Sequence, residues 1–225
     1  MQKTLFTKEE RAIHKLIIDS NGLDDIGLFD GKMGIIISLI NYSRYHKQRA
    51  IEEVADILME QLLDNMTNIF PLSFSNGLTG VGWGIEYLIQ KGYMPGCGAD
   101  ICAEIDEKLM SCDVRRVNDF SLEHGLYGWL HYIVAHIQGA NRCGKRVFDR
   151  MYITDLARIL EAYFDGNETI VEFKNLYKML VETVNGATDV YKFPLDMIIK
   201  KDIKFTINNI SLQKGLAGYL MTRNN

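Results

Sequence analysis

The chain has 225 residues, of which 47% are hydrophobic and 24% are charged, a balance typical of a folded globular protein and not of a disordered one. The 29 acidic residues exceed the 25 basic ones, which gives a net charge of -4 at pH 7. No basic block is longer than Arg115-Arg116 or Lys200-Lys201, which argues against nucleic acid as a partner.

The start of the sequence lacks the apolar run of a signal peptide, and the most apolar stretch, residues 34–40, is too short to cross a bilayer. We therefore expect a cytoplasmic protein without membrane insertion. The cysteines have no CxxC spacing, which argues against a zinc ribbon and favours reduced, partly buried thiols. They are Cys97, Cys102, Cys112 and Cys143.

In chain order, Thr7 and Glu10 form a capping box ahead of an apolar stripe at helical spacing from Ala12 to Ile17. Residues 35–40 are apolar on every side, which predicts a helix that is buried all round. Residues 51–62 instead carry one apolar stripe with acidic residues off it, which predicts a helix with one solvated face.

This alternation continues along the chain. Residues 81–89 and 129–137 are largely apolar, whereas residues 101–109 and 156–163 each carry one apolar stripe. A further helix is predicted from Ile170, Phe173, Tyr177, Leu180 and Val184.

Towards the end of the chain, Pro194 is expected to open a short helix that runs to Lys200. The best strand candidate, residues 204–207, is short. The pattern therefore predicts an all-α protein of about ten helices in five hairpins.

A glycine motif recurs four times. Its pattern is small, apolar, any, any, Gly, any, any, Gly, at residues 27–34, 73–80, 121–128 and 211–218. The first glycines follow one another at spacings of 46, 48 and 90 residues, which indicates a period of about 45 residues with one copy lacking its glycines. A helical hairpin occupies that length. We therefore predict an α/α toroid of inner and outer helices, formed by one domain that spans residues 1–225.

Each glycine pair falls where a loop becomes an inner helix. Glycine there permits positive φ and close approach of neighbouring backbones. The inner helices are then expected to point their N-termini, with unpaired N–H groups and the positive end of the helix dipole, at one mouth of the ring.

The residue before the first glycine is polar in every copy, so we expect Asp30, Asn76, His124 and Lys214 to surround that mouth. His124 suits general acid or base catalysis because it titrates near neutral pH, and Asp30 is the candidate to orient it. The candidates for substrate binding are Asn76, Glu123, Tyr127 and Lys214. In the alternative interpretation Asp30 and Asn76 are helix N-caps and His124 is structural. His131 and His136 are expected in the core or at its rim.

The motifs at residues 73–82, 123–128 and 211–218 resemble the glycine motifs of the lanthionine synthetase C-like (LanC) family, and the motif around Gly31 matches them less well. The resemblance implies an α/α toroid in which zinc activates peptide cysteines for addition to dehydrated serine or threonine. It also implies an acid or base role for His124, and a position for Asp30 or Asn76 where the family has an acidic residue. The family's zinc ligands lie in Trp-Cys-Tyr-Gly and Cys-His-Gly motifs, and this sequence contains neither.

The sequence therefore predicts a shortened bacterial LanC-like protein that binds or modifies a peptide without a zinc cofactor. A module that only binds a peptide or a partner protein is the alternative. A third hypothesis is a carbohydrate-active toroid with Asp30 and Glu123 as acid and base. Three arrangements stay open: a ring closed by this chain alone, an incomplete ring, and a ring completed by a second copy in a homodimer.

Overall fold

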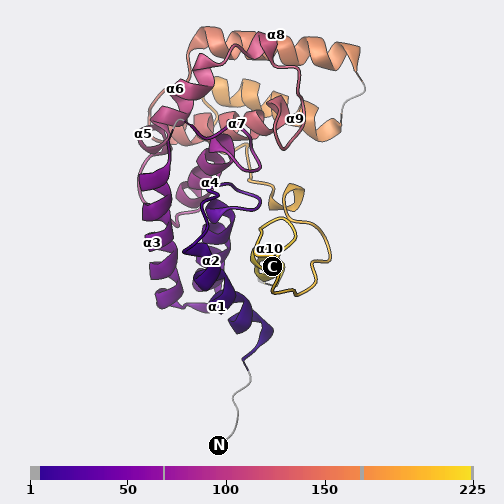
Figure 1. The fold of residues 1–225 in the computed structure, drawn as a ribbon. Helices are drawn as coiled ribbons and strands as arrows, with labels where there is room; N and C mark the ends of the chain where they lie inside the picture. The colour runs from indigo at the N-terminus through magenta and orange to yellow at the C-terminus, as the bar shows by residue number, and fades with distance from the viewer. Residues whose placement is uncertain (1–5, 68, 168–169, 224–225) are drawn as a thin grey trace, which may run out of the picture. The chain divides into compact units, whose positions relative to one another are not determined.

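A computed structural model describes the chain except for residues 1–5, 68, 168–169 and 224–225. The described residues form ten α-helices and two short 3-10 turns, η1 and η2, and no strand (Figure 1). In chain order the elements are α1 (Lys8–Ser20), α2 (Lys32–His46), α3 (Arg49–Asn65), α4 (Leu78–Gln90), α5 (Gly98–Ile101), α6 (Ala103–Ser111), η1 (Val114–Arg116), α7 (Leu126–Arg142), α8 (Arg150–Gly166), α9 (Val171–Val184), η2 (Leu195–Met197) and α10 (Leu216–Met221). The predicted all-α class is confirmed.

The chain divides into two compact units. The first unit comprises Met1–Thr67 and Pro194–Asn225, and the second comprises Asn68–Phe193. The first unit therefore joins the two ends of the sequence, with α1, α2, α3 and α10. The second unit contains α4 to α9. The prediction of one toroidal domain over residues 1–225 stays a prediction.

In the first unit α2 is the central helix. It packs against α3, α10 and α1, and its residues from Lys32 to Ile40 are all buried, as their apolar pattern predicts. The helix α3 buries one stripe only, from Ile51 to Leu62. The capping box of α1 is present, because the Glu10 backbone N–H donates to Thr7 Oγ1 and the Thr7 N–H donates to the Glu10 carboxylate.

In the second unit α7 is the central helix, and all its residues from Leu126 to Ala140 are buried. It packs against α4, α5 and α9. The helix α4 is buried from Leu78 to Leu88, also as predicted. The two central helices of this unit therefore bring together side chains that lie about fifty residues apart in the sequence.

Three local predictions differ from the structure. The helix expected over residues 101–109 is broken at Cys102, which separates α5 from α6. The helix α9 buries Phe173, Leu176, Leu180 and Thr183, whereas Ile170 and Val184 of the predicted stripe are exposed. The short helix after Pro194 is a single 3-10 turn, because the helical hydrogen bonds do not continue beyond Ile199.

Within the described part of the chain, no helix combines the length and the apolar character that crossing a membrane requires.

Candidate functional site

All four glycine motifs form the same loop ahead of a helix. The first glycine of each motif is the N-cap, and the next residue donates its backbone N–H to the carbonyl oxygen seven residues earlier. These hydrogen bonds are 2.8 to 2.9 Å long and join Lys32 to Asp25, Leu78 to Pro71, Leu126 to Asp119 and Leu216 to Asn209. The expected start of a helix at each motif is therefore confirmed.

The N-cap glycines are explained by close packing and not by a left-handed backbone. Their φ angles lie between -140° and -102°, a range open to any residue. A Cβ atom on Gly125 would lie 2.5 Å from the carbonyl carbon of Asp119, and one on Gly77 would lie 2.8 Å from the Ser73 nitrogen. The expectation of positive φ is wrong here, and the expected close approach of the backbone is confirmed. Since the glycines are the N-caps, Asp30 and Asn76 are not.

A second feature of these loops, a side-chain hydrogen bond, was not predicted from the sequence. Asp119 Oδ1 accepts a hydrogen bond from the Ser121 backbone N–H at 2.7 Å. Asn209 Oδ1 and Asp25 Oδ1 accept equivalent bonds from the residues two positions after them. The signal was an Asp or Asn six residues before the N-cap glycine in three of the four motifs, with Pro71 in the other.

In the second unit the loops of Asn76 and His124 are hydrogen-bonded to each other. The Glu123 carbonyl oxygen accepts from the backbone N–H groups of Phe74 at 2.9 Å and Ser75 at 3.0 Å. Glu123 and His124 are exposed, and Asn76 is half-buried. The Asn76 Oδ1 atom is buried and has no hydrogen-bond partner among the described residues. Three predicted site residues therefore lie in two adjoining loops.

The Asp119 carboxylate lies in the loop that carries His124. The pKa of Asp119 lies below its ordinary value, chiefly because the Ser121 backbone N–H donates to it and to a smaller extent because of the charge of His124. Asp30, the predicted orienting group, belongs to the first unit, so that role stays a prediction.

In the first unit the loops of Asp30 and Lys214 are paired in the same way. The Phe29 carbonyl oxygen accepts from the backbone N–H groups of Leu212 at 2.8 Å and Gln213 at 3.4 Å. Asp30 and Lys214, which follow the bonded residues, are both exposed. The first and last motifs of the chain are thus neighbours.

Tyr127 lies in the first turn of α7 and is 9% exposed. Its ring centroid is 4.5 Å from that of Phe173 and 4.9 Å from that of His131, and burial raises the pKa of its hydroxyl. Tyr127, which was predicted to bind a substrate, is therefore largely a core side chain.

His131 is a core residue, as expected. Its Nδ1 lies 2.7 Å from the Tyr191 hydroxyl, which also accepts a hydrogen bond of 2.7 Å from Trp83 Nε1. Burial lowers the pKa of His131 to about 3, so the imidazole is neutral at pH 7. Its Nε2 is buried and has no partner among the described residues.

His136 lies between two carboxylates in the interior of the second unit. Its Nδ1 is 2.7 Å from Glu86 Oε1 and its Nε2 is 2.8 Å from Asp106 Oδ2, with all three side chains between 0% and 8% exposed. Burial on its own lowers the pKa of His136, but the hydrogen bonds and charges of Asp106 and Glu86 outweigh burial and raise it to about 9. The imidazole is therefore cationic at pH 7.

The carboxylates of this cluster have further partners. The Tyr132 hydroxyl donates to Asp106 Oδ1 at 2.6 Å, and Gln90 Nε2 donates to Glu86 Oε2 at 2.6 Å. Glycines make room for Glu86, because a Cβ atom on Gly98 or on Gly139 would lie 2.6 or 2.8 Å from its Cδ. Such full hydrogen bonding is what keeps charged groups stable in a protein interior. The cluster is therefore a structural network.

A cavity of about 250 Å³ adjoins this network. Glu86, Gln90, Gly98, Gly139 and Cys143 contribute to its lining. Glu86 has its two carboxylate oxygens bound to His136 and Gln90, so its charge is already compensated in part.

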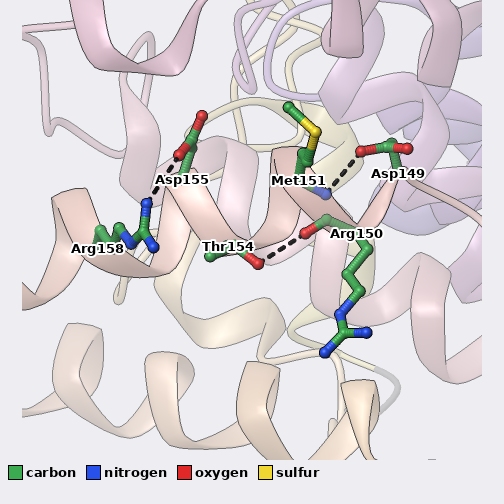
Figure 2. A pocket seen from close by; sticks show the side chains of 6 residues that line it. All are labelled: Asp149, Arg150, Met151, Thr154, Asp155 and Arg158. Carbon is green, nitrogen blue, oxygen red and sulfur yellow. Dashed lines mark hydrogen bonds and ion pairs between the residues drawn. The ribbon is translucent and has the colours of Figure 1, made fainter.

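A larger hollow of about 310 Å³ lies along α8 (Figure 2). Its polar groups are used within the helix itself: Asp149 accepts from the Met151 N–H at 2.6 Å, and Thr154 donates to the Arg150 carbonyl at 2.8 Å. Figure 2 also shows the Asp155–Arg158 ion pair of the same helix. These hydrogen bonds and this ion pair all lie within α8 and its N-cap residue.

The described residues contain no group of three or more His, Cys, Asp or Glu side chains arranged to hold a metal ion. The zinc that the family resemblance implies therefore has no fitting set of donors in this part of the chain.

These features define an all-helical protein whose principal helices start from hydrogen-bonded glycine loops. Comparison of the chain with protein-family models, with curated proteins and with solved structures finds no match.

Proposed function

We propose that this chain is a LanC-like protein that binds a peptide at the loops which carry Asn76, Glu123 and His124. The observation that carries the proposal is the backbone pairing of the two loops in the second unit, which sets these side chains next to one another. The exposed His124 imidazole and the exposed Glu123 carboxylate offer polar contacts to a peptide, and the half-buried Asn76 side chain lies in the adjoining loop.

The finer architecture in the proposal is a shortened α/α toroid. It is supported by the likeness of the two loop pairs: in each unit the carbonyl of one motif's third residue accepts from the second and third residues of another motif. In the first unit the last motif supplies the N–H donors and the first motif supplies the carbonyl acceptor.

Selection from a random peptide library displayed on phage tests the binding function. Peptides enriched by the wild-type protein are expected to bind His124→Ala and Asn76→Ala at least about tenfold more weakly, since each variant loses a polar contact. The matched controls are His14→Ala and Asn175→Ala, which remove exposed side chains of the same kinds on other helices and are expected to bind normally. Equal binding by all four variants, or no enrichment at all, contradicts the proposal.

A peptide that contains one dehydroalanine and one cysteine distinguishes an enzyme from a binding module. Loss of the free thiol with wild-type protein and not with His124→Ala, measured by alkylation and mass spectrometry, would favour an enzyme. Binding without any loss of thiol favours the binding module. Stoichiometric zinc in the purified protein would overturn the zinc-free part of the proposal.

A further inference from the structure

Two of the four cysteines meet beside the Glu86 cavity. Cys97 directly precedes Gly98, and Cys143 follows Gly139 by one helical turn, with its N–H bonded to the Gly139 carbonyl at 3.2 Å. Both glycines pack against the same Glu86 carboxylate, so the start of α5 and the end of α7 approach each other closely.

The pKa of the Cys143 thiol is raised, chiefly by a hydrogen bond with the Cys97 side chain. Cys143 is exposed and lines the cavity, while Cys97 is half-buried. An ion pair between Lys145 and Asp100 joins the same two segments of the chain. Two thiols on segments that pack against each other, one of the thiols accessible to solvent, are placed for thiol–disulfide exchange.

We propose that Cys97 and Cys143 form a reversible disulfide that joins the start of α5 to the end of α7, with a small-molecule disulfide as the oxidant. The inference is independent of the proposed peptide site. The disulfide would join the two segments only under oxidising conditions. Cys143 reacts first with the oxidant, and Cys97 then attacks the mixed disulfide on Cys143.

The reaction with glutathione disulfide balances in two steps. The Cys143 thiol loses its proton and its sulfur attacks one sulfur of the oxidant, which breaks that bond and releases one glutathione thiol. The Cys97 thiol then loses its proton and attacks the Cys143 sulfur, and the second glutathione leaves. The two cysteines are oxidised by two electrons, and the oxidant is reduced to two thiols.

The environment of Cys143 makes the first step depend on pH. The hydrogen bond with Cys97 and partial burial raise the pKa of Cys143 to about 11, so its thiolate is scarce at neutral pH. At pH values below that pKa, we expect each increase of one pH unit to raise the rate of oxidation by up to about tenfold.

Incubation of the full chain with glutathione disulfide, followed by intact-mass measurement and peptide mapping, tests the proposal. Wild-type protein is expected to lose the mass of two hydrogen atoms and to yield a peptide that links Cys97 to Cys143. Dithiothreitol is expected to reverse the change. The oxidised form is also expected to melt at a higher temperature, because the bond closes a long loop in the unfolded chain.

Single serine variants provide the controls. Cys112→Ser, which replaces the other half-buried thiol, is expected to behave as wild type. Cys143→Ser is expected to stay reduced or to carry glutathione at other cysteines, and Cys97→Ser is expected to stop at the mixed disulfide on Cys143. The inference is overturned when wild-type protein accumulates the mixed disulfide, stays reduced, or forms a bond that involves Cys112.

Discussion

His136 Nδ1 lies 2.7 Å from Glu86 Oε1, and both side chains are completely buried. The two residues belong to different central helices of the second unit, α7 and α4. Asp106 binds the other nitrogen of the imidazole at 2.8 Å, so one cation links three segments of the chain. The stability of this unit should therefore depend on the charge of one histidine.

We predict that the protein loses stability as the pH rises from about 6.5 to above 9. The folded pKa of His136 is raised to about 9 from 6.5, so its contribution is complete below the lower value and disappears as the pH passes the higher one. The loss is expected to be about 3 kcal/mol, measured by urea unfolding under reducing conditions. In Glu86→Gln the imidazole keeps one carboxylate, so its folded pKa is raised less, and the loss should be smaller and end at a lower pH. A stability that stays level across this range contradicts the prediction.

Replacement of the cation itself should be costly at pH 7. His136→Gln leaves two buried carboxylates without their shared positive charge, and we expect a loss of about 3–5 kcal/mol in the free energy of unfolding. His124→Gln is the control, because His124 is exposed, and its change should stay within about 0.5 kcal/mol. Similar values for the two variants would mean that the buried network does not stabilise the fold.

The glycine loops predict a contrast between two alanine substitutions. In Gly125→Ala the new Cβ atom meets the Asp119 backbone at 2.5 Å, and the resulting shift should cost about 1–3 kcal/mol. Gly166→Ala, at the end of α8, meets nothing within 4 Å and should be neutral or slightly stabilising. Thermal unfolding of both variants measures the difference. The explanation by close packing fails if Gly125→Ala melts at the wild-type temperature.

The hydrogen bond of Asp119 should support the loop that carries His124. Asp119→Ala removes the acceptor of the Ser121 N–H, and we expect a loss of about 1–2 kcal/mol, together with faster hydrogen exchange at Ser121. Asp165→Ala, an exposed substitution near the end of α8, is the control and should change stability by less than about 0.5 kcal/mol. Unchanged exchange at Ser121 would show that the loop does not need this bond.

The positions of most helices could be predicted because the sequence features that mark them are local. The capping box at Thr7, the uniformly apolar run after Gly34 and the glycine pair before α7 each depend on residues within a few positions of one another. The break at Cys102 was missed because the apolar stripe runs on through both short helices. The buried face of α9 was misjudged because its pattern allows two neighbouring stripes.

The candidate site was predictable only in part. The sequence indicated that Asn76 and His124 occupy equivalent positions, and the second unit brings their loops together. The hydrogen bond by which Asp119 supports the His124 loop was not predicted, because a single Asp before a loop is common. Only its recurrence at Asp25 and Asn209 marks it as part of the motif.

By itself, the sequence determined the all-helical class and the glycine-led starts of four helices, because helical periodicity and loop hydrogen bonds act over a few residues. Only the tertiary structure decided that Glu86 and Asp106 both bind His136 and that the segments which carry Cys97 and Cys143 pack together. Those groups are widely separated along the chain, and no local pattern records which distant helices pack together.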